Sequence, residues 1–278
     1  MAQFLARRWR QQPQGLLKVD WSRPTSEKLS LAFDSANRIE LVNNIAYTTV
    51  VGSKAIHSSA LNGMRGAGFG ATFGSATSDH ITIPNVIQKD GPRTQAFWFY
   101  AISTGGGALA RLFTKPTASD AAGGSEGVTL FSSTSFRVWR NSTAGTKLYE
   151  RIVTVPAALN LFGCLFITHD GIDSVGGFYF NGQSVSSSSS TGIGAYAPEV
   201  NQPIYIGNRP DLSRNWDGWI GPIFQWDRVL SQAEILGITE NPWQIFAPQK
   251  SLMVFLPVTF SYSRPIADVS NTGWVRVP

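Results

Sequence analysis

Apolar and polar residues alternate in short runs along most of the chain, and Gly, Pro, Asn and Ser separate one run from the next. Alternation with a period of two predicts strands with one buried face. The expected strands cover 29–33, 38–42, parts of 68–84, 94–102, 108–114, 128–131, 135–140, 148–155, 161–169, 176–180, 183–187, 204–206 and 216–226. They recur about every 8 to 12 residues, which is the spacing of an all-β sandwich or jelly roll.

Two glycine-bearing motifs add detail to these strands. Asn181 and Gly182 stand between two expected strands and predict a type I′ turn, because both residues tolerate positive φ. Gly218 and Gly221 lie inside an expected strand. Glycines at such positions predict a bulge or the close approach of another backbone.

One short helix is expected near the end of the β region. Ser231 and Glu234 have the spacing of a capping box, in which each residue bonds the backbone of the other. The helix should therefore begin at Ser231 and run to about residue 237. Asn241 and Pro242 then end it, because the residue before proline avoids the helical region.

The two ends of the chain differ from the middle. Residues 1–27 mix aromatic residues, arginines and two prolines without a clear period, which predicts an extended arm. Beyond Pro248 the apolar run 252–260 is interrupted by Pro257, which confines it to an edge strand or an extended arm. The expected organisation is an N-terminal arm (1–27), a β domain (28–248) and a C-terminal arm (249–278).

Charge is sparse and unevenly placed. Charged residues make up 15% of the chain, compared with about 25% in typical globular proteins. Ser, Thr, Asn and Gly must cover much of the surface, as in β-rich extracellular or virion proteins. The net charge is +5, and much of it lies near one end, in Arg7, Arg8, Arg10, Lys18 and Arg23. Such an arm can contact nucleic acid or an acidic protein, but no basic stripe follows, so nucleic acid is not the expected partner.

Cysteine usage and hydropathy exclude several classes of protein. Cys164 is the single cysteine and lies in the apolar run 161–167, which predicts a buried, unreactive thiol. CxxC and HExxH metal motifs are absent from the sequence. No apolar stretch approaches the roughly 18 to 20 residues needed to insert into a membrane. The N-terminal arginines precede no apolar run, so we expect no secretory signal and synthesis in a cytoplasm.

The titratable residues form no recognisable catalytic pattern. A glycoside hydrolase needs two carboxylates close together, whereas the acidic residues here are scattered and ExDxxE does not occur. His57, His80 and His169 are dispersed, and nothing selects one of the many serines as their partner in a catalytic triad. We therefore expect no enzymatic activity and interpret the histidines as solvated or loop residues.

The segment 204–247 carries the most specific motifs: GNR, DGWIGPIFQWDRVLS and AEI. They resemble the end of a concanavalin A-like or laminin-G-like jelly roll. The NPWQIFAP that follows and the later RPIADVSNTGW resemble tailed-bacteriophage virion proteins that carry this domain. The resemblance implies a laminin-G-like jelly-roll sandwich with extended N- and C-terminal arms, covering about residues 29–248 for the fold.

The resemblance also implies a virion structural protein, assembled in the host cytoplasm. A capsid decoration or head fibre protein fits it as well as a tail fibre or spike component does. Apolar and arginine residues of the arms would contact other virion proteins or further copies of the chain, and a trimer would suit a fibre. The expected contact residues are Phe4, Arg7, Arg8, Trp9, Trp21, Trp243, Phe246, Phe255, Phe260 and Trp274.

A second hypothesis, compatible with the first, is a glycan-binding module that attaches the particle to a host surface. Sugar sites combine an aromatic face with planar polar side chains. Asn208, Arg209, Trp216 and Asp217 offer both, and Trp216 is expected to be exposed because it adjoins a polar loop. The alternative is that the aromatics of this strand fill the core. A glycoside hydrolase is a third hypothesis.

A bound ion is the one cofactor under consideration. Some laminin-G-like domains hold Ca²⁺ between loop carboxylates and backbone carbonyls, and this ion takes about six to eight oxygen ligands. Asp79 stands where the family pattern has an acidic residue, and Asp211 lies in the loop after GNR. The alternative is that both aspartates cap turns.

Overall fold

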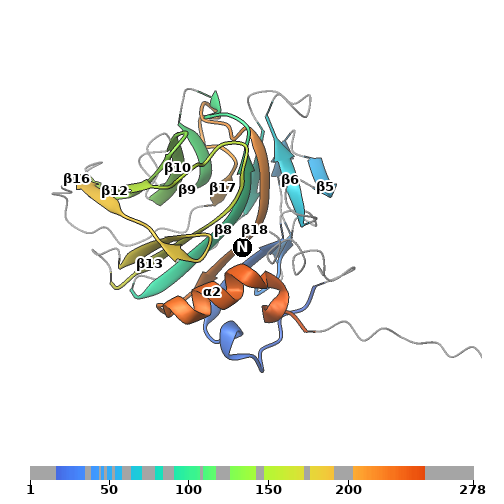
Figure 1. Ribbon diagram of the computed structural model, residues 1–278. Helices are drawn as coiled ribbons and strands as arrows, with labels where there is room; N and C mark the ends of the chain where they lie inside the picture. Colours follow the sequence, from blue (N-terminus) through green and yellow to red (C-terminus); the bar gives the residue numbers. More distant parts are fainter. Residues whose placement is uncertain are drawn as a thin grey trace, which may run out of the picture. The chain divides into compact units, whose positions relative to one another are not determined.

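The computed structural model describes residues 17–34, 39–43, 45–46, 49–51, 54–57, 64–70, 79–83, 91–106, 109–116, 126–141, 147–171, 176–190 and 203–247. Contacts divide the chain into two units, 1–248 and 249–278. All described residues belong to the first unit, in which two antiparallel β-sheets form a sandwich (Figure 1). The expectation of an all-β sandwich is confirmed.

The first sheet contains ten strands, with β18 at its centre. Its main path runs β15-β14-β13-β8-β18-β1-β2-β3, and β6 pairs with both β18 and β5. β18 pairs with β8 along one side and with β1 and β6 along the other. The strands are β1 (Leu29–Asp34), β2 (Ile39–Glu40), β3 (Ile45–Ala46), β5 (Lys54–His57), β6 (Arg65–Phe69), β8 (Arg93–Ala101), β13 (Phe162–His169), β14 (Gly177–Phe180), β15 (Gln183–Ser184) and β18 (Gly218–Trp226).

The second sheet contains eight strands in the order β16-β12-β11-β10-β9-β17-β7-β4. The serine run near residue 188 forms its edge strand, β16, which pairs with β12. The strands are β4 (Thr49–Val51), β7 (His80–Ile83), β9 (Ala110–Lys115), β10 (Glu126–Ser132), β11 (Ser135–Asn141), β12 (Lys147–Thr154), β16 (Ser187–Ser190) and β17 (Ile204–Ile206).

Apolar side chains from the inner faces of both sheets form the main core. Phe97 and Phe99 of β8 face this core, whereas Trp98 between them faces the other side of its sheet, as the period of two requires. Phe99 lies edge-on to Phe136 of β11, with ring centroids 5.1 Å apart. The alternation seen in the sequence thus builds the core directly, and burial of these side chains is the main source of stability.

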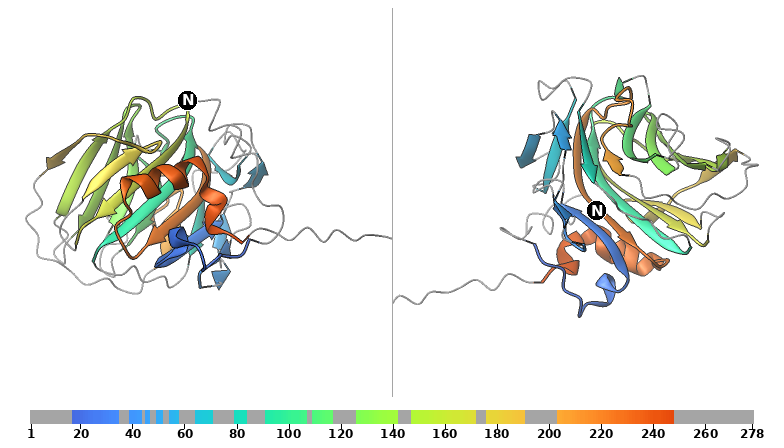
Figure 2. Two further views of the ribbon diagram at one scale, coloured as in Figure 1. Left: turned by 60° about the horizontal axis from the view of Figure 1, so that its bottom comes forward. Right: turned by 180° about the vertical axis from the view of Figure 1, so that it is seen from behind.

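A second apolar cluster covers the opposite face of the ten-stranded sheet. Helix α2 (Gln232–Glu240) and the 3-10 helix η5 (Pro242–Ile245) lie on that face, as Figures 1 and 2 show from three sides. The side chains of Ile235 and Ile238 are fully buried there. The predicted capping box begins the helix: the backbone N of Ser231 donates to Glu234 Oε2 at 2.9 Å, and the backbone N of Glu234 donates to Ser231 Oγ at 3.3 Å.

Residues 17–27 pack against this second cluster. Val19 forms an isolated bridge with Phe246, and the backbone N of Asp20 donates to the carbonyl of Ile245 at 2.9 Å. The 3-10 helix η1 (Pro24–Ser26) follows and leads into β1. The described part of the expected N-terminal arm therefore lies on its own domain, and no packing boundary separates it from β1.

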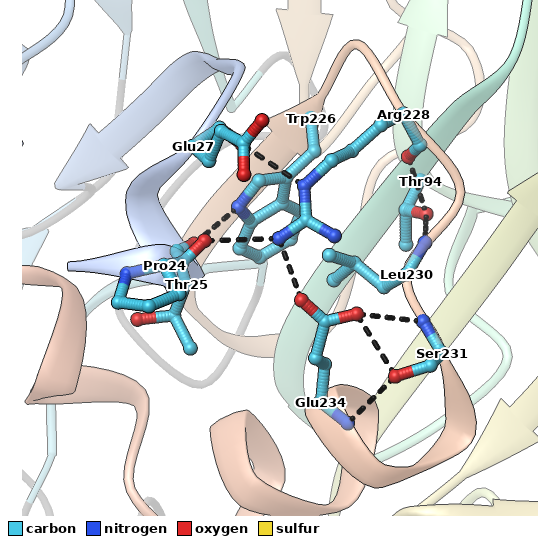
Figure 3. A network of polar contacts seen from close by, with 9 residues as sticks. All are labelled: Pro24, Thr25, Glu27, Thr94, Trp226, Arg228, Leu230, Ser231 and Glu234. Carbon is cyan, nitrogen blue, oxygen red and sulfur yellow. Dashed lines mark hydrogen bonds and ion pairs between the residues drawn. The ribbon is translucent and has the colours of Figure 1, made fainter.

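A polar network fastens this segment to the sheet and to helix α2 (Figure 3). The indole Nε1 of Trp226 donates to the carbonyl of Thr25 at 2.7 Å. The guanidinium of Arg228 donates to the carbonyl of Pro24 at 3.0 Å and to Oε1 of Glu234 at 2.7 Å. Arg228 thus joins the N-terminal segment to the capping box, just after the end of β18.

The structure corrects two of the predicted contact residues. Trp243 and Phe246 are 6% and 4% exposed and belong to the second apolar cluster. Phe246 also lies edge-on to Phe224 of β18, with centroids 5.9 Å apart. Their own domain covers these rings, so a neighbouring subunit cannot bind them. Trp21 is 57% exposed and remains available. Phe4, Arg7, Arg8, Trp9, Phe255, Phe260 and Trp274 lie outside the described residues.

Two local predictions are confirmed. Asn181 and Gly182 both have positive φ, 51° and 79°, as a type I′ turn requires. A β-carbon at Gly218 would overlap the carbonyl of Tyr100 on the neighbouring strand. The pairing of β18 with β8 shifts register on either side of Gly221, so the glycines mark both a close approach and a bulge.

Cys164 is fully buried in β13, and burial raises the pKa of its thiol well above the usual range. The prediction of a buried cysteine is confirmed, and the protonated form explains why it should be unreactive. In the part of the chain that the structure describes, no helix is both long and apolar enough to cross a membrane.

Candidate functional site

Asn208, one of the predicted sugar contacts, organises the polar loop between β17 and β18. Its side-chain amide donates to the carbonyl of Asp79 at 3.2 Å. Its Oδ1 accepts from the backbone N of Arg209 and of Arg214 at 2.9 and 3.0 Å. Because Asn208 is fully buried, it shapes the loop from inside and is not placed to contact a sugar.

The prediction that Trp216 is exposed is wrong. Its side chain is fully buried in the core between the sheets, edge-on to Phe99 with centroids 5.7 Å apart. The reason is register: Trp216 has the same parity as Ile220 of β18, which faces that core. Asp217 has the opposite parity, is partly exposed and accepts from Ser103 Oγ at 2.6 Å.

The two predicted calcium ligands have different surroundings. Asp79 is fully buried; its Oδ2 accepts from the backbone N of Gly70 at 2.8 Å, and its Oδ1 has no hydrogen-bond partner. Asp211 is exposed and bonds Arg209 and Ser213 instead. No group of three or more His, Cys, Asp and Glu side chains within the described ranges could hold a metal ion.

The outward side of the eight-stranded sheet carries a row of polar side chains across three strands. Thr129 of β10 pairs in register with Arg111 of β9 and with Arg137 of β11. The neighbouring residues Val128 and Leu130 face the core, so the row faces away from it. The guanidinium of Arg111 donates to Thr129 Oγ1, and this bond joins β9 to β10 within the row.

An indole ring lies beside this row. The guanidinium carbon of Arg111 is 4.1 Å from the centroid of the Trp139 ring, which is a cation–π contact. Gly127 of β10 gives the ring its space, because a β-carbon there would overlap Cζ2 and Cη2 of Trp139. Both partners are buried: Arg111 is 8% and Trp139 is 4% exposed.

The loop after β17 brings further arginines to the same place. The backbone N of Arg111 donates to the carbonyl of Arg214 at 3.0 Å, which joins the loop to β9. Burial lowers the pKa of Arg111 to about 9, and the positive charges of Arg209, Arg137 and Arg214 contribute to the decrease. The negative charge of Asp211 raises the pKa of Arg111 and so opposes this decrease. We call Arg111, Thr129, Arg137, Trp139, Arg209 and Arg214 the arginine face.

An exposed aromatic ring stands near the arginine face. Phe131 of β10 is 42% exposed and is the extra residue of a bulge, where the pairing of β10 with β11 shifts between Leu130 and Ser132. Bulges re-aim side chains: Leu130 lies in the core, whereas Phe131, two residues after Thr129, is exposed to solvent. Arg137, whose side chain is 24% exposed, forms an ion pair with Glu150 of β12.

A match to a known family covers residues 74–236, more than half of the chain: the Concanavalin A-like lectin/glucanases superfamily. The chain belongs to this superfamily. Comparison with curated proteins finds no match. The superfamily and the two-sheet architecture together confirm the expected fold, whereas a bacteriophage origin stays a prediction.

Solved structures of the same fold have low sequence identity to this chain. The binding domain of Paraclostridial Mosquitocidal Protein 1 is 14% identical with a TM-score of 0.55, over 78% of this chain and 52% of that one. The binding domain of botulinum neurotoxin serotype D is 12% identical with a TM-score of 0.56, over 77% and 51%. The chain thus spans about half the length of these two domains.

A third structure matches over nearly its full length. Domain 4 of AbnA, a GH43 extracellular arabinanase from Geobacillus stearothermophilus, was solved in complex with arabinotriose. It is 12% identical with a TM-score of 0.50, over 76% of this chain and 98% of that one. At these identities the likeness is one of fold, which superfamily members of different activity share.

The sandwich also contains a buried polar cluster around His169. His169 is fully buried, with Nδ1 3.1 Å from the Tyr149 hydroxyl and Nε2 3.4 Å from Gln95 Oε1. The interpretation of this histidine as solvated is therefore wrong, and burial lowers its pKa well below the usual range. Beside it, the Arg93–Glu126 ion pair spans the two sheets at 2.8 Å.

The ionisation of this cluster does not suit acid catalysis. Burial by itself would raise the pKa of Glu126, but the charges of Arg93 and Arg140 outweigh it and hold the pKa at about 2. A glycosidase acid needs a raised pKa so that it carries a proton near neutral pH. Glu126 is therefore a structural carboxylate.

Sequence reasoning missed the arginine face, although the sequence contains a signal for it. Arg137 and Trp139 are two residues apart in an expected strand whose alternate residues, Phe136 and Val138, are apolar. That pattern places both on the outward side. What the sequence does not contain is the order of the strands, which brings Arg111 and the β17–β18 loop to the same place.

Proposed function

We propose that this domain is a non-enzymatic carbohydrate-binding module that uses the outward side of its eight-stranded sheet. The observation that carries the proposal is Phe131, an exposed aromatic ring on a sheet face that also presents Arg137. Membership of a superfamily that includes lectins supports it. So do the names of the similar structures, which include toxin binding domains and a domain solved with arabinotriose.

The chemistry of this face suits a sugar ring. Phe131 offers an apolar ring against which the C–H face of a pyranose can stack. The guanidinium of Arg137 is held by Glu150, and a planar donor group in a fixed position suits vicinal hydroxyls. Thr154, exposed at the end of β12, pairs with Ser135 and adds hydroxyl groups nearby.

Binding of the purified full chain to an array of bacterial and host polysaccharides tests this proposal. Phe131→Ala should weaken binding to any positive glycan by at least about tenfold. Leu236→Ala is the matched control, because Leu236 is 40% exposed on α2, which covers the other sheet. Equal loss in both variants, or no binding to any glycan, would contradict the proposal.

A second proposal is a structural role in a virion, through contacts with other virion proteins or with further copies of the chain. The virion location and the expected trimer rest on the resemblance of 241–248 and 264–274 to phage proteins. Trp21 favours this role, because a tryptophan that is 57% exposed is a typical interface anchor. The test variants are the chain lacking 1–16, which keeps the described segment 17–27, and the chain lacking 249–278. If the full chain and both shortened chains are monomers at high concentration, the result would argue against self-assembly.

Calcium binding remains a proposal for one of the two predicted ligands. Asp79 fits, because its buried Oδ1 has no hydrogen-bond partner and could accept a cation. Asp211 does not fit, because its carboxylate already bonds Arg209 and two groups of Ser213. If the ion binds, calcium should raise the melting temperature of the chain, and Asp79→Asn should abolish that increase while Asp211→Asn should not.

A further inference from the structure

Arg111 is a buried cation that has no anionic partner among the residues that the structure describes. It is 92% buried, being 8% exposed, yet no carboxylate pairs with it among the described residues and its Nε has no hydrogen-bond partner. Its contacts are the Thr129 hydroxyl and the Trp139 ring. Removing a guanidinium from water is costly unless an opposite charge compensates. A structural role alone would be served equally well by a neutral side chain.

The surroundings of Arg111 add positive charge. Arg209, Arg137 and Arg214 are close enough to disfavour the charged form of Arg111. The acidic groups nearby, Glu150 and Asp211, are bonded to Arg137 and Arg209, and only Asp211 noticeably offsets the repulsion at Arg111. The arginine face therefore has a positive potential centred on Arg111, which no carboxylate of the described ranges neutralises.

Neighbouring residues hold the arginine face in a defined geometry. Gly127 leaves room for the Trp139 ring, the guanidinium of Arg111 lies over that ring, and Thr129 accepts a hydrogen bond from the same guanidinium. The β17–β18 loop is pinned by the buried Asn208, so Arg209 and Arg214 are held next to the sheet. Preorganised guanidinium groups bind carboxylate and sulfate oxygens well because they lose little conformational freedom.

From this geometry we propose that the arginine face recognises acidic saccharides, with the anionic group of the sugar bound by Arg137 and Arg209 above the buried Arg111. Arg111 is a positioning residue: it contributes charge and holds Trp139. Phe131 stacks on an adjoining sugar ring. This inference rests on the proposed function and names its ligand class.

Titration with matched oligosaccharides tests the inference. The probes are an oligogalacturonate, its fully methyl-esterified form, and a sulfated oligogalactose of the same length. The acid should bind at least about tenfold tighter than the ester, and its affinity should decrease between about 50 and 300 mM NaCl. The sulfated probe distinguishes recognition of any anion from recognition of a carboxylate.

Arginine variants connect the effect to this face. Arg137→Gln and Arg111→Gln should each reduce the affinity for the acid by at least about tenfold more than they reduce the affinity for the ester. Arg23→Gln is the control of equal charge change, because its 53% exposed side chain pairs with Asp20 in the N-terminal segment. A melting temperature within a few degrees of wild type confirms that Arg137→Gln, at a half-buried position, remains folded.

The outcomes separate the two proposals. Equal binding of acid and ester, abolished by Phe131→Ala, would overturn the acidic ligand class and leave the carbohydrate-binding function standing. A preference for the acid that Arg111→Gln and Arg137→Gln leave unchanged would place the anion elsewhere and also overturn the inference. Failure of every glycan, neutral or acidic, to bind would overturn both.

Discussion

The guanidinium carbon of Arg111 lies 4.1 Å from the centroid of the Trp139 ring, on the outward side of the eight-stranded sheet. Cation–π contacts of this kind are worth about 0.5 to 2 kcal/mol, more when both partners are removed from water. The pair depends on a third residue, Gly127, whose missing side chain leaves space for the indole.

Gly127→Ala should therefore destabilise the domain by about 1 to 3 kcal/mol, because the new methyl group would overlap the indole within a packed face. Gly237→Ala is the control: the nearest atom to a β-carbon there is Gln244 Nε2 at 3.8 Å, and Gly237 lies inside helix α2. Alanine in a helix should stabilise by roughly 0.5 to 1 kcal/mol. Urea unfolding measures both, and a Gly127→Ala protein of unchanged stability would contradict the described ring position.

Arg228→Gln should loosen the N-terminal segment. The substitution removes the bonds to the carbonyl of Pro24 and to Glu234, and loss of such bonds typically costs about 1 to 3 kcal/mol. Hydrogen exchange should accelerate in 17–27 and in the first turn of α2 more than in β8. Arg23→Gln removes only an exposed ion pair with Asp20, so its effect should stay within about 0.5 kcal/mol.

Trp243→Ala and Trp21→Ala should differ strongly in their effect on stability. Trp243 is 6% exposed in the second apolar cluster, and truncation of a buried tryptophan costs about 3 to 5 kcal/mol. Trp21 is 57% exposed, so its truncation should change the free energy of unfolding by less than about 0.5 kcal/mol. Thermal and urea unfolding measure both. Equal destabilisation would mean that Trp21 is also buried, in an assembly or by another part of the chain.

Stability should decrease as the pH falls below about 6.5, the ordinary histidine pKa. His169 is buried and its pKa is lowered, so in this range the unfolded chain binds a proton that the folded domain does not. The slope for one proton is at most about 1.4 kcal/mol per pH unit. His169→Gln should remove this slope between about pH 6.5 and 5. An unchanged slope would assign the acid sensitivity to another group.

A second decrease is expected at lower pH from Glu126. Its folded pKa of about 2 lies below the ordinary value of 4.5, so its contribution is complete above about pH 4.5 and is lost as the pH falls toward 2. Glu126→Gln should be less stable than wild type at neutral pH, because it leaves the buried Arg93 without its carboxylate. The gap between the two proteins should narrow below about pH 4. A constant gap would contradict the ion pair.

Local features of the fold could be predicted from the sequence because neighbouring residues determine them. The turn at Asn181 and Gly182 follows from positive φ, the bulge near Gly221 from a glycine within a strand, and the start of α2 from the spacing of Ser231 and Glu234. Period-two alternation likewise fixed which side of each strand is apolar. These signals need no knowledge of which strands are neighbours.

Tertiary structure alone decided which parts of the molecule the large aromatic and charged side chains contact. Trp216, Trp243 and Phe246 are large aromatic residues, and the sequence does not say whether the chain itself or a partner covers them. The order of the strands places Arg111 and Arg137 on either side of Thr129 although 26 positions separate them (137 − 111). Side-chain pattern is a local property, whereas burial and electrostatic potential depend on every segment that the fold brings within a few ångströms.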